Sequence, residues 1–148
     1  PVVYYSRMEN EKGKSIVEIV VGVTKSRWDG AHYRAVVSSG GWRVALLNHG
    51  ERFAVKGPLE RHLKTDEAFV LLDGAVTLWI GAEETPVRLE PFAVYCVKAG
   101  VWHRVTTVPG TRCLVVENDD TGPANTEYAN ASCGVKDFTT VRQEGGLK

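Results

Sequence analysis

Short β-rich runs follow one another along most of this chain, and glycine or proline separates nearly all of them. These runs occupy residues 2–5, 15–24, 33–39, 42–50, 52–57, 67–74, 75–81, 87–91, 93–100, 102–110 and 112–118. No stretch of a dozen residues carries a convincing helical period. Regularly spaced short strands with turn signals between them are typical of an antiparallel sandwich or barrel. The pattern therefore predicts an all-β fold.

The length of the chain fits one such domain. Its 148 residues suffice to bury a core without a disulfide or a structural metal. We interpret residues 1–148 as a single domain whose core lies at about 42–118. Asp73-Gly74 predicts a hairpin turn, because this pair tolerates a positive φ. The polar, glycine- and asparagine-rich segment 119–148 is interpreted as a tail that wraps the barrel or reaches a partner subunit.

The charge balance argues against several kinds of partner. Eighteen basic residues match 18 acidic ones, so there is no basic excess to hold a nucleic-acid backbone. No apolar run approaches the roughly 18 residues that a membrane span needs. The N-terminal sequence lacks the features of a signal peptide, and the three cysteines are widely spaced with no CxxC pair. We therefore expect a reduced, cytoplasmic protein with a small-molecule partner.

Four ionisable residues are predicted to converge inside this barrel. Glu60 and His62 alternate on one strand, so they share a face. If the chain turns back at 64–66, Glu67 can return beside them, and His103 opens a later strand. Two imidazoles and two carboxylates are a suitable ligand set for Zn, Mn, Fe or Ni. A divalent cation also offsets the cost of burying them.

Two segments resemble the motifs of the cupin superfamily. The first family motif is His-x-His, then Glu after three or four residues and Gly after six more, and it corresponds to ERH at 60–62, Glu67 and Gly74. The second motif, Pro-x-Gly-x-x-His, corresponds to KAGVWH at 98–103. The resemblance covers about residues 42–118. It implies a cupin-type double-stranded β-helix (jelly-roll) barrel whose mouth is the binding site, and it also suggests a homodimer.

The chain departs from the family motifs at two positions. Glu60 stands where the family has its first histidine, and Lys98 stands where it has proline. A glutamate ligand makes a metal site harder and more anionic, which favours Mn, Zn or Fe(II). The same departure leaves open a metal-free site in which Glu60 and Glu67 perform acid–base catalysis.

A narrower set of segments is similar to ureidoglycolate lyase. These are ERH at 60–62, EAF at 67–69, GVWH at 100–103 and LVVEN at 114–118. The resemblance implies cleavage of a C–N bond in a ureido hydroxy acid, releasing urea and glyoxylate. Two alternatives stay open: a metal-dependent isomerase or dioxygenase on the same site, and a non-catalytic cupin that binds a small ligand.

Three further residues are candidates for binding substrate. Lys98 lies at a strand end, where a cation at the barrel mouth could hold a carboxylate, although a surface lysine is the plainer interpretation. Arg43 could offer a bidentate guanidinium to the same group, or it could be an exposed charge. Tyr95 is a candidate for the pocket or for the core.

Overall fold

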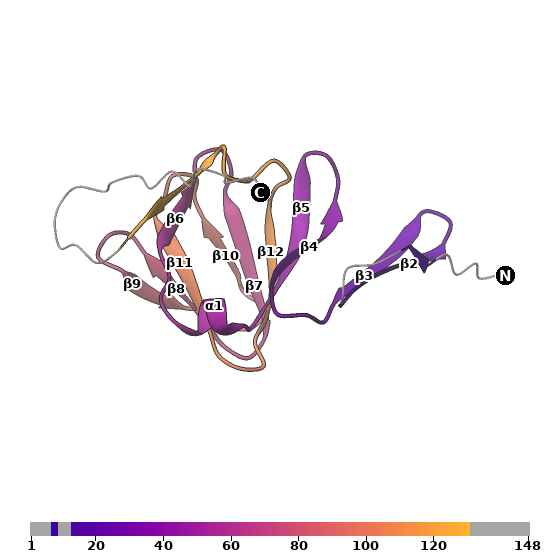
Figure 1. The fold of residues 1–148 in the computed structure, drawn as a ribbon, viewed down its shortest axis with the longest axis horizontal. Helices are drawn as coiled ribbons and strands as arrows, with labels where there is room; N and C mark the ends of the chain where they lie inside the picture. Colours follow the sequence, from indigo (N-terminus) through magenta and orange to yellow (C-terminus); the bar gives the residue numbers. More distant parts are fainter. Residues whose placement is uncertain (1–6, 9–12, 131–148) are drawn as a thin grey trace, which may run out of the picture.

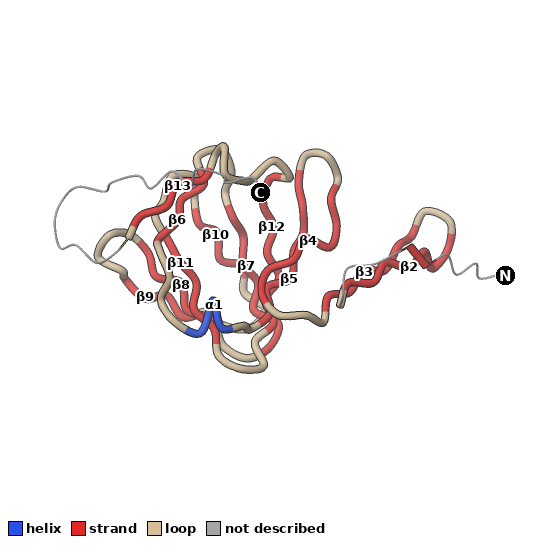
Figure 2. Tube along the Cα trace, in the orientation of Figure 1, coloured by secondary structure: helices blue, strands red, loops and turns tan. Residues whose placement is uncertain are grey.

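The computed structural model describes residues 7–8 and 13–130, and these residues form an almost entirely β structure (Figure 2). In chain order its elements are β1 (Arg7–Met8), β2 (Lys14–Val20), β3 (Val23–Trp28), β4 (His32–Ser38), β5 (Trp42–Asn48), α1 (Glu51–Ala54), β6 (Leu59–His62), β7 (Glu67–Asp73), β8 (Val76–Ile80), β9 (Thr85–Arg88), β10 (Val94–Val97), β11 (His103–Thr107), β12 (Arg112–Asn118) and β13 (Thr126–Ala129).

Two five-stranded antiparallel sheets form the body of the barrel (Figure 1). One has the strand order β10-β7-β12-β5-β4, and the other has the order β13-β6-β11-β8-β9. Alternate residues of β7 are buried, so Phe69 and Leu71 point into the space between the sheets, where they meet Leu78 and Val115. The all-β, jelly-roll prediction is confirmed.

Residues 15–24 were predicted to be one run, but they form most of a hairpin. β2 ends at Val20, and β3 begins at Val23 and pairs with it antiparallel. Gly22 between them has a φ of 82°, a value that glycine adopts without strain. With β1 these strands form a separate three-stranded sheet, which projects from the barrel as an arm (Figure 1).

The run at 52–57 was predicted as a strand and is partly helical instead. Glu51–Ala54 form the single turn of α1. Among the residues that the structure describes, no helix is long and apolar enough to cross a membrane.

The strands β6 and β7 do not pair with each other, contrary to the simplest interpretation of the turn at 64–66. β6 pairs with β11 and β13, whereas β7 pairs with β10 and β12. The connection is held by distant backbone: Leu63 N donates to Asn125 O at 2.8 Å, and Asn118 N donates to Thr65 Oγ1 at 2.9 Å. The chain therefore crosses from one sheet to the other here, so Glu67 faces β6 across the barrel.

The segment interpreted as a C-terminal tail contributes a strand within its described part. β13 pairs with β6 so that Thr126 lies opposite His62 and Tyr128 lies opposite Glu60. Residues 131–148 lie outside the described residues. Residues 126–129 thus form part of the wall beside the predicted site.

Candidate metal centre

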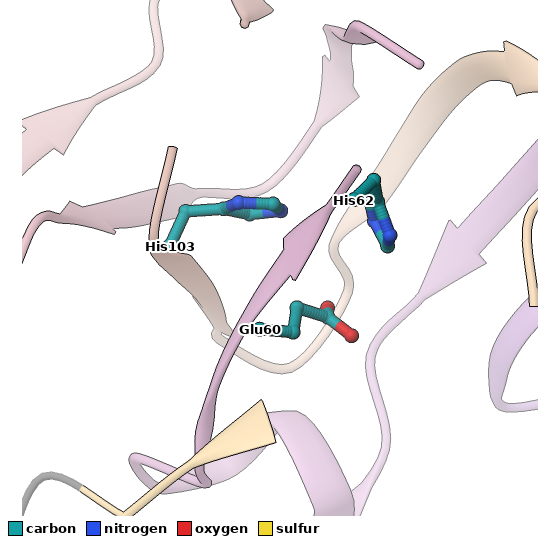
Figure 3. Close-up of side chains that lie close together, drawn as sticks. All are labelled: Glu60, His62 and His103. Atoms are coloured by element: carbon teal, nitrogen blue, oxygen red, sulfur yellow. The ribbon is translucent and has the colours of Figure 1, made fainter. Parts of the chain in front are cut away.

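Three of the four predicted ligands lie on neighbouring strands of one sheet. Glu60 and His62 alternate on β6, and the first residue of β11, His103, is the cross-strand partner of Glu60. Figure 3 shows their side chains directed toward a common space. One ligand atom from each of the three lies within 4.8 Å of the others.

The fourth predicted ligand, Glu67, comes from the facing sheet. Its Oε2 lies 2.9 Å from Nε2 of His103 and 3.3 Å from Nε2 of His62. All three residues are buried, and His103 is only 1% exposed. The structure therefore brings Glu60, His62, Glu67 and His103 together, although the connection between β6 and β7 differs from the one expected.

Hydrogen bonds fix the orientation of both imidazoles. The Nδ1–H of His103 donates to the carbonyl oxygen of Val101 at 2.9 Å. A neutral His103 consequently has its lone pair on Nε2, facing Glu67. Nδ1 of His62 lies 2.9 Å from Oγ1 of Thr126, which leaves its Nε2 facing the same carboxylate. Such outer partners are typical of histidines that bind metal ions through Nε2.

A cavity of about 170 Å³ opens beside these groups. It is lined by Tyr33, Arg43, Leu47, Arg52, Phe53, Glu60, His62, Glu67, Phe69, Val105, Glu117, Thr121, Gly122, Thr126 and Tyr128. Six of these residues are Arg, Glu or His and only four are apolar (Leu47, Phe53, Phe69 and Val105), so the lining is more charged than that of a typical apolar ligand pocket.

A family model matches the part of the chain that carries these residues. Residues 51–117 match the family model described as "Cupin domain", a range that begins at α1 and ends within β12. The chain contains a cupin domain. No curated protein matches the chain.

Solved structures resemble this chain at low sequence identity, and those with a TM-score of at least 0.5 show a likeness of fold. Pac13 from Streptomyces, solved with uridine, has 7% identity and a TM-score of 0.52, and the match covers 84% of each chain. BH2720 from Bacillus halodurans has 18% identity and a TM-score of 0.50, with 63% of this chain and 74% of that chain covered. KdgF from Halomonas has 14% identity and a TM-score of 0.48, with 78% and 89% covered.

The pKa values of the two carboxyl groups of the site, Glu60 and Glu67, are shifted in opposite directions. Burial opposes ionisation of Glu67, but hydrogen bonds from His103 and His62 outweigh it and lower its pKa to about 2. Burial, together with the nearby charge of Glu67, raises the pKa of Glu60. Glu67 thus stays an anion, whereas Glu60 keeps its proton to a higher pH than an ordinary glutamate does.

The donor set of this cupin fits a divalent cation. Nε2 of His103 and a carboxylate oxygen of Glu67 are both acceptors when the ring is neutral, yet they lie 2.9 Å apart. Such a pair needs either a proton or a cation between its members. Imidazole nitrogens with carboxylate oxygens suit Zn, Mn, Fe or Ni. Glu60, His62, Glu67 and His103 are the residues that would hold it.

Two of the three candidate substrate-binding residues lie away from the cavity. Nζ of Lys98 pairs with Asp66 at 2.6 Å on the surface. Tyr95 is not among the residues that line the cavity, and its hydroxyl accepts a hydrogen bond from Glu90 N at 3.1 Å. Arg43 does line the cavity, but its guanidinium is paired with Glu117 at 2.9 Å.

Sequence reasoning missed two charged residues of the cavity. Glu117 lies on β12, where Cys113, Val115 and Glu117 are the buried alternate positions. Glu117 occupies a strand position whose alternate neighbours, Cys113 and Val115, are apolar, and this pattern could have identified it as an inward-facing carboxylate. Arg52 on α1 makes no hydrogen bond or ion pair with any residue that the structure describes, and it carried no such signal.

We expect metal affinity in this cupin to rise with pH. Burial lowers the pKa values of His62 and His103, but hydrogen bonding to Glu67 outweighs it, so both pKa values end above the ordinary 6.5. Protons therefore compete with the metal up to a higher pH than for a free imidazole. Affinity should rise by about tenfold per pH unit for each proton displaced. Calorimetric titration with Mn²⁺ from about pH 6 to about pH 8 measures this, and a flat profile would contradict it.

Proposed function

We propose that this protein is a metal-dependent small-molecule enzyme that cleaves a C–N bond in a ureido hydroxy acid, as the resemblance to ureidoglycolate lyase implies. The observation that carries the proposal is the cluster of Glu60, His62, Glu67 and His103 beside a cavity of about 170 Å³. A cavity of this size suits a ligand smaller than a typical drug molecule.

The residues of the cavity can divide the reaction between them. In this cleavage the substrate hydroxyl loses its proton, the C–N bond breaks, and the leaving urea nitrogen gains a proton. Glu60 suits both transfers because its pKa is raised. In the metal-free protein Glu67 orients His62 and His103 by accepting hydrogen bonds from their protonated Nε2 atoms, and with an ion bound all three side chains would be its ligands. A divalent ion held there would supply Lewis acidity toward a substrate oxygen.

The substrate carboxylate has a different partner from the ones expected. Arg43 is already paired with Glu117, and Lys98 is paired with Asp66. Arg52 lines the cavity from α1 and has no ion-pair partner among the described residues, so we assign the carboxylate to it.

The test is turnover by protein that has been stripped of metal and then loaded with Mn²⁺, Zn²⁺, Fe²⁺ or Ni²⁺ in parallel. Ureidoglycolate should give urea and glyoxylate with at least one of these ions, and Arg52→Gln should raise KM more than it lowers kcat. Turnover of another carbonyl or hydroxy-acid substrate instead would favour an isomerase or dioxygenase. Tight ligand binding without product would favour a non-catalytic cupin.

Homodimer formation and a cytoplasmic location also remain proposals. The arm supports the first, because it projects from the barrel and exposes apolar side chains at its tip. Val21 there is 93% exposed and Val20 is 52% exposed. Sedimentation of the intact chain beside Val21→Lys would test whether the tip contributes to association.

A further inference from the structure

Glu117 is a buried carboxylate with one satisfied oxygen and one unsatisfied oxygen. The residue is 5% exposed. Its Oε1 accepts from Nε of Arg43 at 3.1 Å, from Nη2 of Arg43 at 2.9 Å and from the hydroxyl of Tyr33. Its Oε2 is closed off from solvent and has no hydrogen-bond partner among the residues that the structure describes. An unpaired buried carboxylate oxygen is costly, so this atom requires an occupant.

The surroundings of Glu117 indicate which occupant fits. One ligand atom each of His62, Glu67 and Glu117 lie within 4.8 Å of one another. A divalent ion at about 2.0–2.2 Å from each of its ligands holds the ligand atoms roughly 3 to 4 Å apart, so small shifts of these side chains bring them into range. A water or a substrate hydroxyl has to approach from outside at a longer distance, and Oε2 is sealed against it. A small cation bound between the side chains meets no such restriction.

The charges of the cavity favour the same occupant. Glu60, Glu67 and Glu117 face two guanidiniums, of which Arg43 is bound to Glu117 and Arg52 is exposed. With neutral histidines and all three glutamates ionised, the carboxylates outnumber the guanidiniums. A divalent cation offsets this excess and pairs the free oxygen of Glu117.

We propose that Glu117 is a metal ligand and that, with His62 and Glu67, it forms a second position for the cation beside the one formed by Glu60, His62 and His103. The inference rests on the metal dependence within the proposed function. Nδ1 of His62 lies against Thr126, so only its Nε2 can bind the ion. Since both positions need that one nitrogen, they are alternatives for a single ion, and the cost of leaving the buried Oε2 of Glu117 unpaired favours the position that includes Glu117.

The experiment titrates metal-free protein with Mn²⁺ and Zn²⁺ and records the visible spectrum of the Co²⁺ form. Wild type should bind one ion per chain. Glu117→Gln should bind at least about tenfold more weakly and change the Co²⁺ spectrum. Tyr33→Phe is the matched control, because it removes a donor to Oε1 and leaves Oε2 untouched. Its affinity should stay within about threefold of wild type and its spectrum should be unchanged.

Several results would overturn the inference. These are equal affinity and an equal spectrum for Glu117→Gln and wild type, equal weakening in both variants, two ions per chain, or no binding by wild type. If Glu117→Gln does not fold, Glu117→Asp is measured in its place. Weaker metal binding and a changed Co²⁺ spectrum are then expected, and unchanged binding would contradict the proposal. If metal binds as expected but no substrate is turned over, the proposed enzymatic function is wrong. The proposal that Glu117 is a metal ligand would still hold.

Discussion

Replacing His62 and His103 together with alanine is expected to abolish stoichiometric metal binding and any turnover. In the wild type the Nε2 atoms of both rings face Glu67. The double variant therefore lacks two of the four proposed metal ligands. Removing a single residue that hydrogen-bonds to a metal ligand lowers metal affinity by roughly 10- to 100-fold. Removing two of the ligands themselves should lower it further. Elemental analysis of untagged protein measures the loss directly.

The control for this double variant is another histidine of the same chain. His49 is hydrogen-bonded through Nδ1 to Thr107 at 2.8 Å and does not line the cavity. His49→Ala should keep its full metal content. If the alanine pair does not fold, because Glu67 then lacks its buried partners, the His62→Gln/His103→Gln pair retains N–H donors toward it.

Absence of metal in the wild type, even after titration, would decide against the first mechanism. Glu60 and Glu67 would then be candidates for acid–base catalysis without a metal, or the barrel would be a plain binding cavity. Metal retained by the double variant would instead place the ion elsewhere in the protein.

The positions of the turns could be predicted from the sequence, but the pairing of the strands on either side of each turn could not. The chain does bend at Gly74, directly after Asp73, and Gly74 has a φ of 75°. The strands on either side of it, β7 and β8, nevertheless belong to different sheets, so the predicted hairpin is wrong. A tight turn within a sheet and a crossing between sheets need the same local residues. Distant contacts, such as those of Thr111 with Ala75, select between them.

The same distinction explains which parts of the site were predictable. Glu60 and His62 share a face because they alternate on one strand, which is a local property, whereas the place of His103 was inferred with the help of the resemblance to the second cupin motif. It is harder to predict which arginine is free to bind substrate, because the sequence does not show whether Arg43 or Arg52 has a carboxylate partner. Only the structure shows that one of them is neutralised by Glu117 and the other is not. The pairing depends on β5 and β12 lying side by side.

Gly74→Ala is expected to destabilise the protein by about 3 kcal/mol or more, through two additive causes. An alanine at this positive φ costs about 1 kcal/mol or slightly more. Its Cβ would also lie 2.6 Å from Cα and 2.8 Å from N of Thr111, so backbone has to move. Thr111 cannot yield easily, because its hydroxyl bonds both the amide and the carbonyl of Ala75.

Gly100→Ala separates these two causes. Gly100 has a φ of 79°, close to that of Gly74, but a Cβ there would meet nothing within 4 Å. It should therefore lose only the conformational part, about 1 kcal/mol. Urea denaturation of both metal-free variants beside wild type measures the difference. Equal losses would mean that the backbone around Thr111 adapts, and that the glycine is needed for its φ rather than for the close approach of the two chain segments.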